Sequence, residues 1–146
     1  MQKNIYIQNP YFTENKILNE LILAGSRGVD VRVILPSTSD YGFMDSSNIV
    51  TTNIMIKNGI RVYRYPKISH IKAAIYDGWA CLGSANFDAL SLRINLESNL
   101  AFSNPEAVER LKEDLFEKDF SVSREITVPV KVTLLDYLGE MISNQL

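Results

Sequence analysis

His70 is the only histidine of this 146-residue chain, and Lys72, Ser84 and Asn86 lie close to it in the sequence. The four side chains are an imidazole, an ammonium, a hydroxyl and an amide. Together they can hold a phosphate, because they offer a charge for its oxygens, two neutral donors, and a nucleophile or acid for phosphorus. Gly83 would let the backbone approach the anion closely. The spacing therefore indicates chemistry at a phosphate group.

A β-hairpin is the element expected to bring these side chains together. Asp77-Gly78 is a two-residue turn signal between two runs of strand-forming residues, 70–76 and 79–85. Residues two apart in a strand project from the same face. The imidazole and the ammonium therefore project together from one strand, and the hydroxyl and the amide project together from the other. If the hairpin pairs these positions, all four groups meet on one patch.

Two further features of the sequence suit an anionic substrate. Glu97 is the natural candidate to accept a hydrogen bond from the second ring nitrogen of His70, which would fix the tautomer and raise the basicity of the reacting nitrogen. Between residues 46 and 76 there are basic residues and no acidic ones, which gives a local positive field. These basic residues are Lys57, Arg61, Arg64, Lys67 and Lys72. Taken singly, each feature also suits a solvated surface or a structural histidine.

Composition indicates one soluble globular domain over residues 1–146, large enough to bury a core, with 46% hydrophobic and 22% charged residues. The net charge of −2 gives no general reason to expect nucleic acid. Cys81 is the single cysteine, so it cannot form an internal disulfide, and we expect a small buried hydrophobe. No apolar run approaches the ~20 residues of a membrane-spanning helix, and the N-terminus lacks the apolar core of a signal peptide.

The elements that must position the hairpin alternate between strand and helix. Thr13 is the expected N-cap of the first helix, and Asn104-Pro105-Glu106 is a strong start signal for a later one. Strands are expected at 4–8, 29–35, 60–65 and 94–102, and helices at 13–28, 46–58, 104–116 and 130–142. The order predicts an α/β fold, a mixed β-sheet flanked by helices on both faces.

The pattern His70-x-Lys72-x4-Asp77, followed by Gly83-Ser84-x-Asn86, resembles the signature of the phospholipase D superfamily, known as the HKD motif. The resemblance extends over essentially the whole chain and is to the C-terminal half of bacterial cardiolipin synthases. Further segments that carry it are NPYF (9–12), AGSRGVDVRVILP (24–36), the dipeptide at 39–40, NGIRVYRY (58–65), NFDALSLRINLESNLAF (86–102) and LKEDLFEKDFSVSREIT (111–127).

The resemblance implies a role for each residue of the motif. His70 matches the nucleophile that forms a phosphohistidine intermediate, and Glu97 matches the acid that orients it. Lys72, Ser84 and Asn86 match the phosphate-binding residues. The two remaining motif positions, Asp77 and Gly83, match structural ones, and the aspartate of the family lies away from the phosphate.

The sequence also departs from the family pattern. Five residues separate Asp77 from Gly83, where the family more often has six. Because side-chain facing alternates along a strand, one deleted residue reverses it unless the turn or a bulge absorbs the change. Leu90 stands where many members carry an arginine. The N-terminal half, which supplies a second motif in the family, has no counterpart in this sequence.

By this resemblance, the reaction is a two-step transfer of a phosphatidyl group from an anionic phospholipid to phosphatidylglycerol or a similar alcohol, with neither metal nor cofactor. The second motif would come from a homodimer mate or from the missing half. The expected location is peripheral, on the cytoplasmic side of the bacterial inner membrane. Two alternatives stay open: a homodimeric phosphodiesterase or nuclease of the same superfamily, and a truncated half that binds phosphate without turnover.

Overall fold

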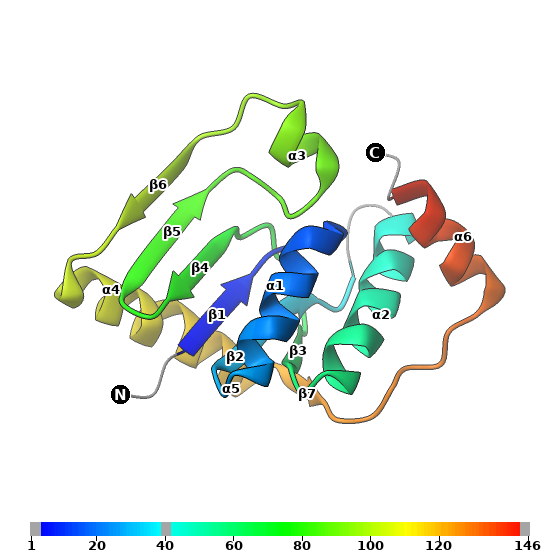
Figure 1. The fold of residues 1–146 in the computed structure, drawn as a ribbon, viewed down its shortest axis with the longest axis horizontal. Coiled ribbons are helices and arrows are strands. Elements are labelled where there is room, and N and C mark those ends of the chain that lie inside the picture. The colour runs from blue at the N-terminus through cyan, green and yellow to red at the C-terminus, as the bar shows by residue number, and fades with distance from the viewer. Residues whose placement is uncertain (1–3, 39–41, 144–146) are drawn as a thin grey trace.

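The structure is a computed structural model that describes residues 4–38 and 42–143, apart from the side chains at 42–44, 89, 90, 135, 139, 140, 142 and 143. Its centre is a seven-stranded sheet in the order β6-β5-β4-β1-β2-β3-β7 (Figure 1). The strands are β1 (Asn4–Gln8), β2 (Asp30–Pro36), β3 (Arg61–Tyr65), β4 (Ala73–Tyr76), β5 (Trp79–Gly83), β6 (Asn99–Phe102) and β7 (Arg124–Ile126). The pairs β1–β2 and β2–β3 are parallel and the others antiparallel, so the prediction of a mixed sheet is confirmed.

Helices cover both faces of the sheet, as predicted, but unevenly. One face carries α1 (Asn15–Ser26) and α2 (Gly42–Lys57), with α6 (Leu134–Ser143) packed on α2. The other face carries one continuous helix made of α4 (Pro105–Leu111), a π-helical stretch η1 (Lys112–Glu117) and α5 (Lys118–Val122). The short α3 (Ala89–Arg93) lies between β5 and β6 in the chain. In Figure 1, α1 and α2 lie over β1, β2 and β3 and leave β4, β5 and β6 uncovered on that face.

Two hydrophobic cores follow from the alternation of side chains along the strands. In β1 the fully buried Ile7 belongs to the core under α1 and α2, whereas Tyr6 belongs to the core under α4, η1 and α5. Neighbouring Val33 and Ile34 in β2 divide in the same way. Strands that bury both faces need apolar residues throughout, and this explains the β-branched run recognised in the sequence.

Several element boundaries differ from the predicted ones. The N-cap of α1 is Glu14 and not Thr13, because the backbone N–H groups of both residues donate to the carbonyl of Phe87, at 2.8 and 3.0 Å, and keep the chain extended there. Helix α2 begins at Gly42, one turn earlier than expected. The strand expected over 94–102 begins only at Asn99. Strand β7, helix α3 and the π-helical stretch were not predicted.

The start of α4 confirms its sequence signal. The side chain of Asn104 accepts a hydrogen bond from the backbone N–H of Ala107 at 2.9 Å, and Pro105 occupies the first turn. Val108 and Phe116 are buried on the stripe that faces the sheet. The predicted helix therefore forms, although its middle turns have π-helical hydrogen bonding.

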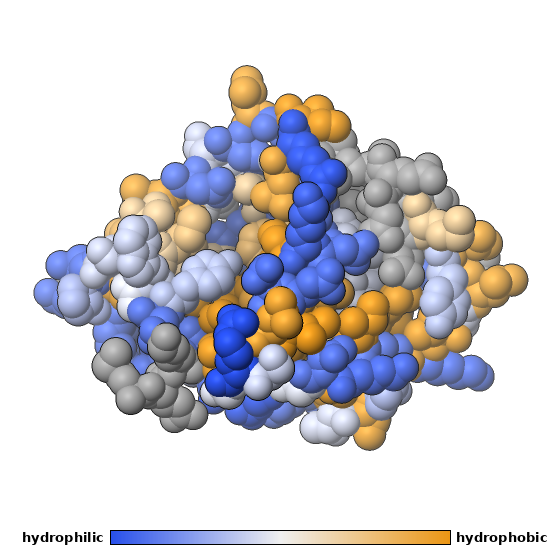
Figure 2. Space-filling model, in the orientation of Figure 1, coloured by the Kyte–Doolittle hydropathy of each residue, from blue (hydrophilic) through white to orange (hydrophobic). Residues whose placement is uncertain are grey.

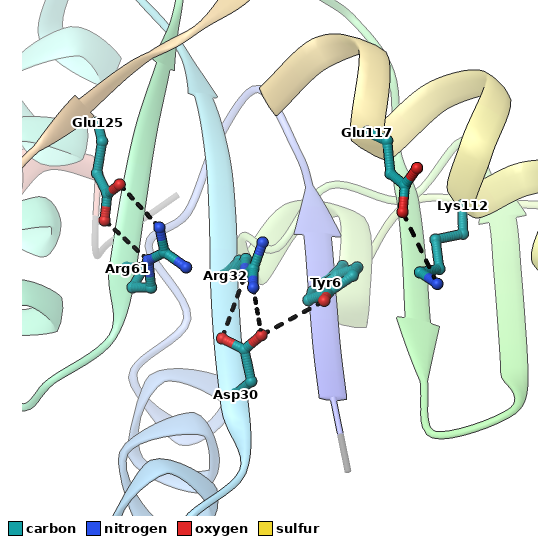
Figure 3. Close-up of polar contacts among 7 residues, drawn as sticks. All are labelled: Tyr6, Asp30, Arg32, Arg61, Lys112, Glu117 and Glu125. Atoms are coloured by element: carbon teal, nitrogen blue, oxygen red, sulfur yellow. Dashed lines mark hydrogen bonds and ion pairs between the residues drawn. The ribbon is translucent and has the colours of Figure 1, made fainter. Parts of the chain in front are cut away.

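Charged side chains join the outer strands on the α4–α5 face (Figure 3). Arg61 of β3 donates two hydrogen bonds to Glu125 of β7, at 2.8 and 2.9 Å. Arg32 of β2 forms an ion pair with Asp30 at 2.7 Å, and its guanidinium also stacks over the ring of Tyr6. The two-pronged contact between Arg61 and Glu125 fixes the short edge strand β7 against β3.

The free energy of unfolding at acidic pH should depend on the contact between Arg61 and Glu125. The hydrogen bonds from Arg61 hold the pKa of Glu125 below its ordinary value. The resulting stabilisation is present above the ordinary glutamate pKa, ~4.3, and is lost as the pH falls through the lower folded-state value. Because both side chains are partly exposed, Glu125→Gln should lower the free energy of unfolding at pH 7 by only about 0.5–1 kcal/mol.

Urea denaturation at pH 7 and at pH 3 measures this effect. The difference between Glu125→Gln and the unmodified chain should shrink at the lower pH. Glu113→Gln is the matched control, because it neutralises an exposed glutamate of the π-helical stretch η1. It should leave the urea midpoint unchanged. An equal loss of stability at both pH values would contradict the assignment.

Candidate active site

The motif residues lie where the β4–β5 hairpin ends. Tyr76 pairs with Trp79 across the two-residue turn, whose residues Asp77 and Gly78 have φ angles of 43° and 93°. Positive φ at both positions is what such a hairpin turn requires. At the other end the ladder closes with the backbone N–H of Gly83 donating to the carbonyl of Lys72 at 3.1 Å. The predicted hairpin is therefore confirmed, with strands that are shorter than expected.

The four chemical groups do not converge through the strand register. The ladder sets Lys72 opposite Gly83, so in a continued ladder Ser84 would project from the opposite face. Instead the chain bends at Ser84, whose backbone N–H donates to the carbonyl of Ser98 at 3.0 Å. The expectation that paired strand positions bring the groups together is wrong, because regular pairing ends before these residues.

Lys72 and His70 form the closest contact of the site. The Nζ atom of Lys72 lies 2.9 Å from each ring nitrogen of His70 and 3.1 Å from its carbonyl oxygen. An ammonium only donates hydrogen bonds, so which of the two ring nitrogens accepts from Lys72 depends on the tautomer of His70. His70 itself is exposed, and the ring of Tyr11 approaches it edge-on at 6.5 Å.

The charge of Lys72 is buried without an ion pair. Only 8% of the residue is exposed, and burial lowers the pKa of its ammonium, while Glu97 and Asp88 act in the opposite direction. Within the described part of the chain, no carboxylate lies within ion-pairing distance of its Nζ atom. A buried cation of this kind is poorly compensated, and an incoming anion would supply the missing charge.

Glu97 contacts the motif through Ser84. The hydroxyl of Ser84 donates a short hydrogen bond to the Glu97 carboxylate, and the same hydroxyl accepts from the backbone N–H of Ser98 at 3.0 Å. The bond from Ser84, with a smaller contribution from the charge of Lys72, lowers the pKa of Glu97. We expected the Glu97 carboxylate to accept a hydrogen bond from the ring of His70. Among the described hydrogen bonds, none joins these two side chains, and the carboxylate accepts from Ser84 instead.

Asn86 and Gly83 lie in closely packed surroundings. The side-chain oxygen of Asn86 is buried and has no hydrogen-bond partner among the described residues. A side chain at Gly83 would collide with Asn99, since a Cβ atom there would lie 1.8 Å from the Asn99 Oδ1 atom. The glycine therefore permits the close approach of β6.

The other sequence features lie apart from the site. Asp77 is in the turn at the far end of β4 from Lys72. Among the basic residues between 46 and 76, Arg61 is engaged by Glu125, and Arg64 donates to the carbonyl of Pro36 at 2.9 Å. The dipeptide at 39–40 and the side chain of Leu90 lie outside the described residues. Cys81 is half-buried and not fully buried.

Asn9 was missed by the sequence reasoning and fixes the backbone around Asn86. Its side chain is 2% exposed, donates to the carbonyl of Ala85 at 3.4 Å and accepts from the backbone N–H of Phe87 at 3.3 Å. Asn48 of α2 holds the segment after Asn9 in the same manner, donating to the carbonyl of Pro10 at 2.9 Å. An asparagine at a strand end was the only available signal, and it suggests a turn before it suggests a clamp.

Gln8 supports the segment that carries His70. It is 1% exposed, and its amide nitrogen donates to Asp119 at 2.8 Å and to the hydroxyl of Ser69 at 3.3 Å. Ser69 directly precedes His70 in the chain. The end of β1 and helix α5 therefore together position the backbone from which the imidazole ring projects. These contacts join residues 61 and 111 positions apart, and no local pattern could reveal them.

Two classes of feature are absent from the described residues. No group of three or more histidine, cysteine, aspartate or glutamate side chains there could hold a metal ion. Nor does that part of the chain include a helix with the length and apolar character needed to cross a membrane. The described geometry places an exposed imidazole beside a buried ammonium that has no ion pair among the described residues.

Comparison with known proteins identifies the family of this chain. The family described as "Cardiolipin synthase, PLD-like domain" matches residues 1–120. A cardiolipin synthase of Clostridium perfringens is 34% identical over 97% of this chain, and the probable cardiolipin synthase YwiE of Bacillus subtilis is 36% identical over 86% of it. The chain spans only 30% and 26% of these two relatives.

Solved structures share the fold. Nuc from Salmonella typhimurium, a phospholipase D family member, has a TM-score of 0.75 at 24% identity, over 87% of this chain and 84% of its own. A phosphatidylserine synthase from Haemophilus influenzae has a TM-score of 0.71 at 15% identity, over 99% of this chain and 42% of its own. With the family match and the motif geometry taken together, this chain belongs to the phospholipase D-like domain family of the cardiolipin synthases.

Proposed function

We propose that this chain is the motif-bearing half of a cardiolipin synthase-type phosphatidyltransferase, and that it acts on anionic phospholipids through a phosphohistidine at His70. The observation that carries the proposal is the ammonium of Lys72, which is buried against the ring of His70 and has no ion pair among the described residues. A phosphodiester anion is the ligand that compensates such a charge while it presents phosphorus to the ring.

In the first step, an unprotonated ring nitrogen of His70 attacks phosphorus. A P–N bond forms as the P–O bond to the first alcohol breaks, and that alcohol leaves with a proton from a second acid. In the second step the acceptor alcohol gives its proton to the conjugate base of that second acid and attacks, and the P–N bond breaks. Lys72 and Asn86 stabilise the negative charge on the phosphoryl oxygens in both steps, and Ser84 joins them only when its hydroxyl proton turns from Glu97 to the phosphate.

The second acid must come from outside this chain. A cation needed for phosphate charge should not release its proton, so Lys72 does not serve, and the sequence contains no other histidine. A second motif from a homodimer mate or from a further half of the protein would supply the imidazole. In a dimer the twofold axis would use the same surface of each copy. A phospholipid substrate also implies a peripheral membrane location, on the cytoplasmic side of the bacterial inner membrane.

One observation favours a second candidate function, a homodimeric phosphodiesterase. The chain shares its fold with Nuc, a phospholipase D family member, at a TM-score of 0.75. Against a nuclease stands the net charge of −2. A non-catalytic half that binds phosphate would show the same buried lysine, and oligomeric state together with turnover separates the three functions.

Removing the nucleophile should abolish turnover. In any assembly that converts phosphatidylglycerol, His70→Ala should lower the rate by at least ~10⁴-fold, because covalent catalysis has no alternative route at this site. The exposed position of His70 should leave the thermal midpoint unchanged. Phospholipid turnover by thin-layer chromatography measures the loss, with the exposed Ser103→Ala as control. Turnover within tenfold of the unmodified protein would contradict the proposal.

The titration of Glu97 should depend on Ser84. Since the hydroxyl of Ser84 is the largest cause of the lowered pKa of Glu97, Ser84→Ala should raise that pKa toward the ordinary glutamate value. The pH dependence of the side-chain carboxyl ¹³C resonance measures the shift. Ser121→Ala, which removes an exposed hydroxyl far along the chain, should leave the resonance unaffected. An unchanged Glu97 titration in Ser84→Ala would show that another group stabilises the carboxylate.

Oligomeric state should decide whether the chain is active alone. A monomer has one imidazole, so it should bind phosphate without turnover, and activity should appear only with a dimer or with an added second half. Analytical ultracentrifugation at the enzyme concentration of the assay provides the measurement. A strictly monomeric species with enzymatic phosphodiester cleavage would refute the two-imidazole mechanism.

A further inference from the structure

A cavity of about 160 Å³ opens next to Lys72 on the face of the sheet that carries α1 and α2. Its floor is formed by small side chains of the hairpin and of the segment that follows it, Ala74, Cys81 and Ala85. Two aromatic side chains, Tyr76 and Phe87, also line it. The cavity begins at the lysine of the phosphate site and continues along the hairpin away from it.

The cavity exists because the sheet is asymmetric at this end. On the α4 side, β4 and β5 place Ile75 and Leu82 in the hydrophobic core. On the cavity side, the cross-strand pair is Ala74 with Cys81, which fills little volume. Helices α1 and α2 do not extend over these strands, and apolar side chains, orange and tan in Figure 2, are open to solvent there.

The lining makes the cavity suited to carbon and not to a polar head group. Leu92 of α3 adds a further apolar side chain, and burial raises the pKa of the Tyr76 hydroxyl to about 12, so this wall stays uncharged. Apart from the Tyr76 hydroxyl, the polar side chains of the lining are Lys72 of the phosphate site, Asn9 and Asn99. A ligand that spans both regions needs an anionic end at the lysine and an apolar continuation.

We propose that this cavity receives the glyceride end of the phospholipid whose phosphate is held at His70 and Lys72. The proposal rests on the function proposed above and assigns the direction of the substrate within the site: the first acyl carbons of the glyceride end enter the cavity, and the head-group alcohol leaves toward the open side. The volume resembles that of an apolar cavity of ~150 Å³ that admits benzene. It therefore takes the first carbons of an acyl chain beyond its ester group and leaves the rest of the lipid outside.

The single cysteine of the chain is a built-in probe, since Cys81 is half-buried and lines the cavity. The rate at which a small thiol reagent modifies Cys81 should fall when dihexanoyl phosphatidylglycerol is bound below its micelle concentration. At a ligand concentration ten times the dissociation constant, the expected slowing is about tenfold. Glycerophosphoglycerol, which has the same phosphodiester and no acyl chains, should leave the rate nearly unchanged. The double variant Cys81→Ala/Ser103→Cys places the thiol on the exposed surface and should show no protection by either ligand.

A second measurement does not use the thiol. Ala85→Leu places a larger side chain into the cavity from a segment outside the β-ladder, and it should reduce the calorimetric affinity for dihexanoyl phosphatidylglycerol to that for glycerophosphoglycerol. Ser103→Leu adds the same side chain on the surface and should preserve the difference. If both diesters bind equally to the unmodified chain and neither protects Cys81, the cavity assignment is wrong and the proposed function stands. If neither diester binds at all, the proposed function fails together with it.

Discussion

The burial of the Lys72 ammonium is the constraint on which the rest of the site depends. A charged group removed from water destabilises the fold unless something compensates it, and here the compensation is incomplete. The nearest carboxylates act on Lys72 only through their fields, because Glu97 is occupied by Ser84, and Asp88 accepts a hydrogen bond from the backbone N–H of Ser91 at 2.7 Å. The fold thus keeps its anions beside the cation without allowing them to neutralise it, and a place for a ligand anion remains.

Keeping such a charge in place requires a rigid frame, and the frame is built from strand ends. The carboxyl end of β1 continues into Asn9, whose amide holds the segment after β5, while Asn48 holds the loop from the other side. At the edge, Gly83 lets β6 approach β5, which brings the Glu97–Ser98 segment against Ser84. Functional groups at the ends of strands are held in place by the rigid sheet, while their own backbone groups lie outside its hydrogen-bonded ladder.

The sequence predicted those parts whose signals are local. Asp77-Gly78 predicted the hairpin turn, Asn104-Pro105 predicted the start of α4, and the motif residues predicted a phosphate site, which the geometry of Lys72 supports. The prediction of Thr13 as the N-cap was wrong because its backbone N–H donates to the carbonyl of Phe87, 74 residues further along the chain. The contacts of Gln8 with Ser69 and Asp119 are equally distant in sequence. Spacing rules describe regular ladders, and the site lies where the ladder stops, so tertiary contacts set its geometry.

Phosphate binding and phosphoryl transfer have different structural requirements, and a site with a single, exposed imidazole separates them. On the proposed function, binding needs the buried cation and its neighbours. Transfer needs, in addition, a proton donor on the opposite side of phosphorus, and the sequence has no second histidine to supply it, while His70 itself is exposed. A partner that completed the site would exclude water from the phosphate as it delivered the acid, so the assembly that makes catalysis possible would also protect a phosphohistidine from hydrolysis. On the proposed function, coupling these two effects to one interface would make a folded half of such a site depend on a second half for its chemistry.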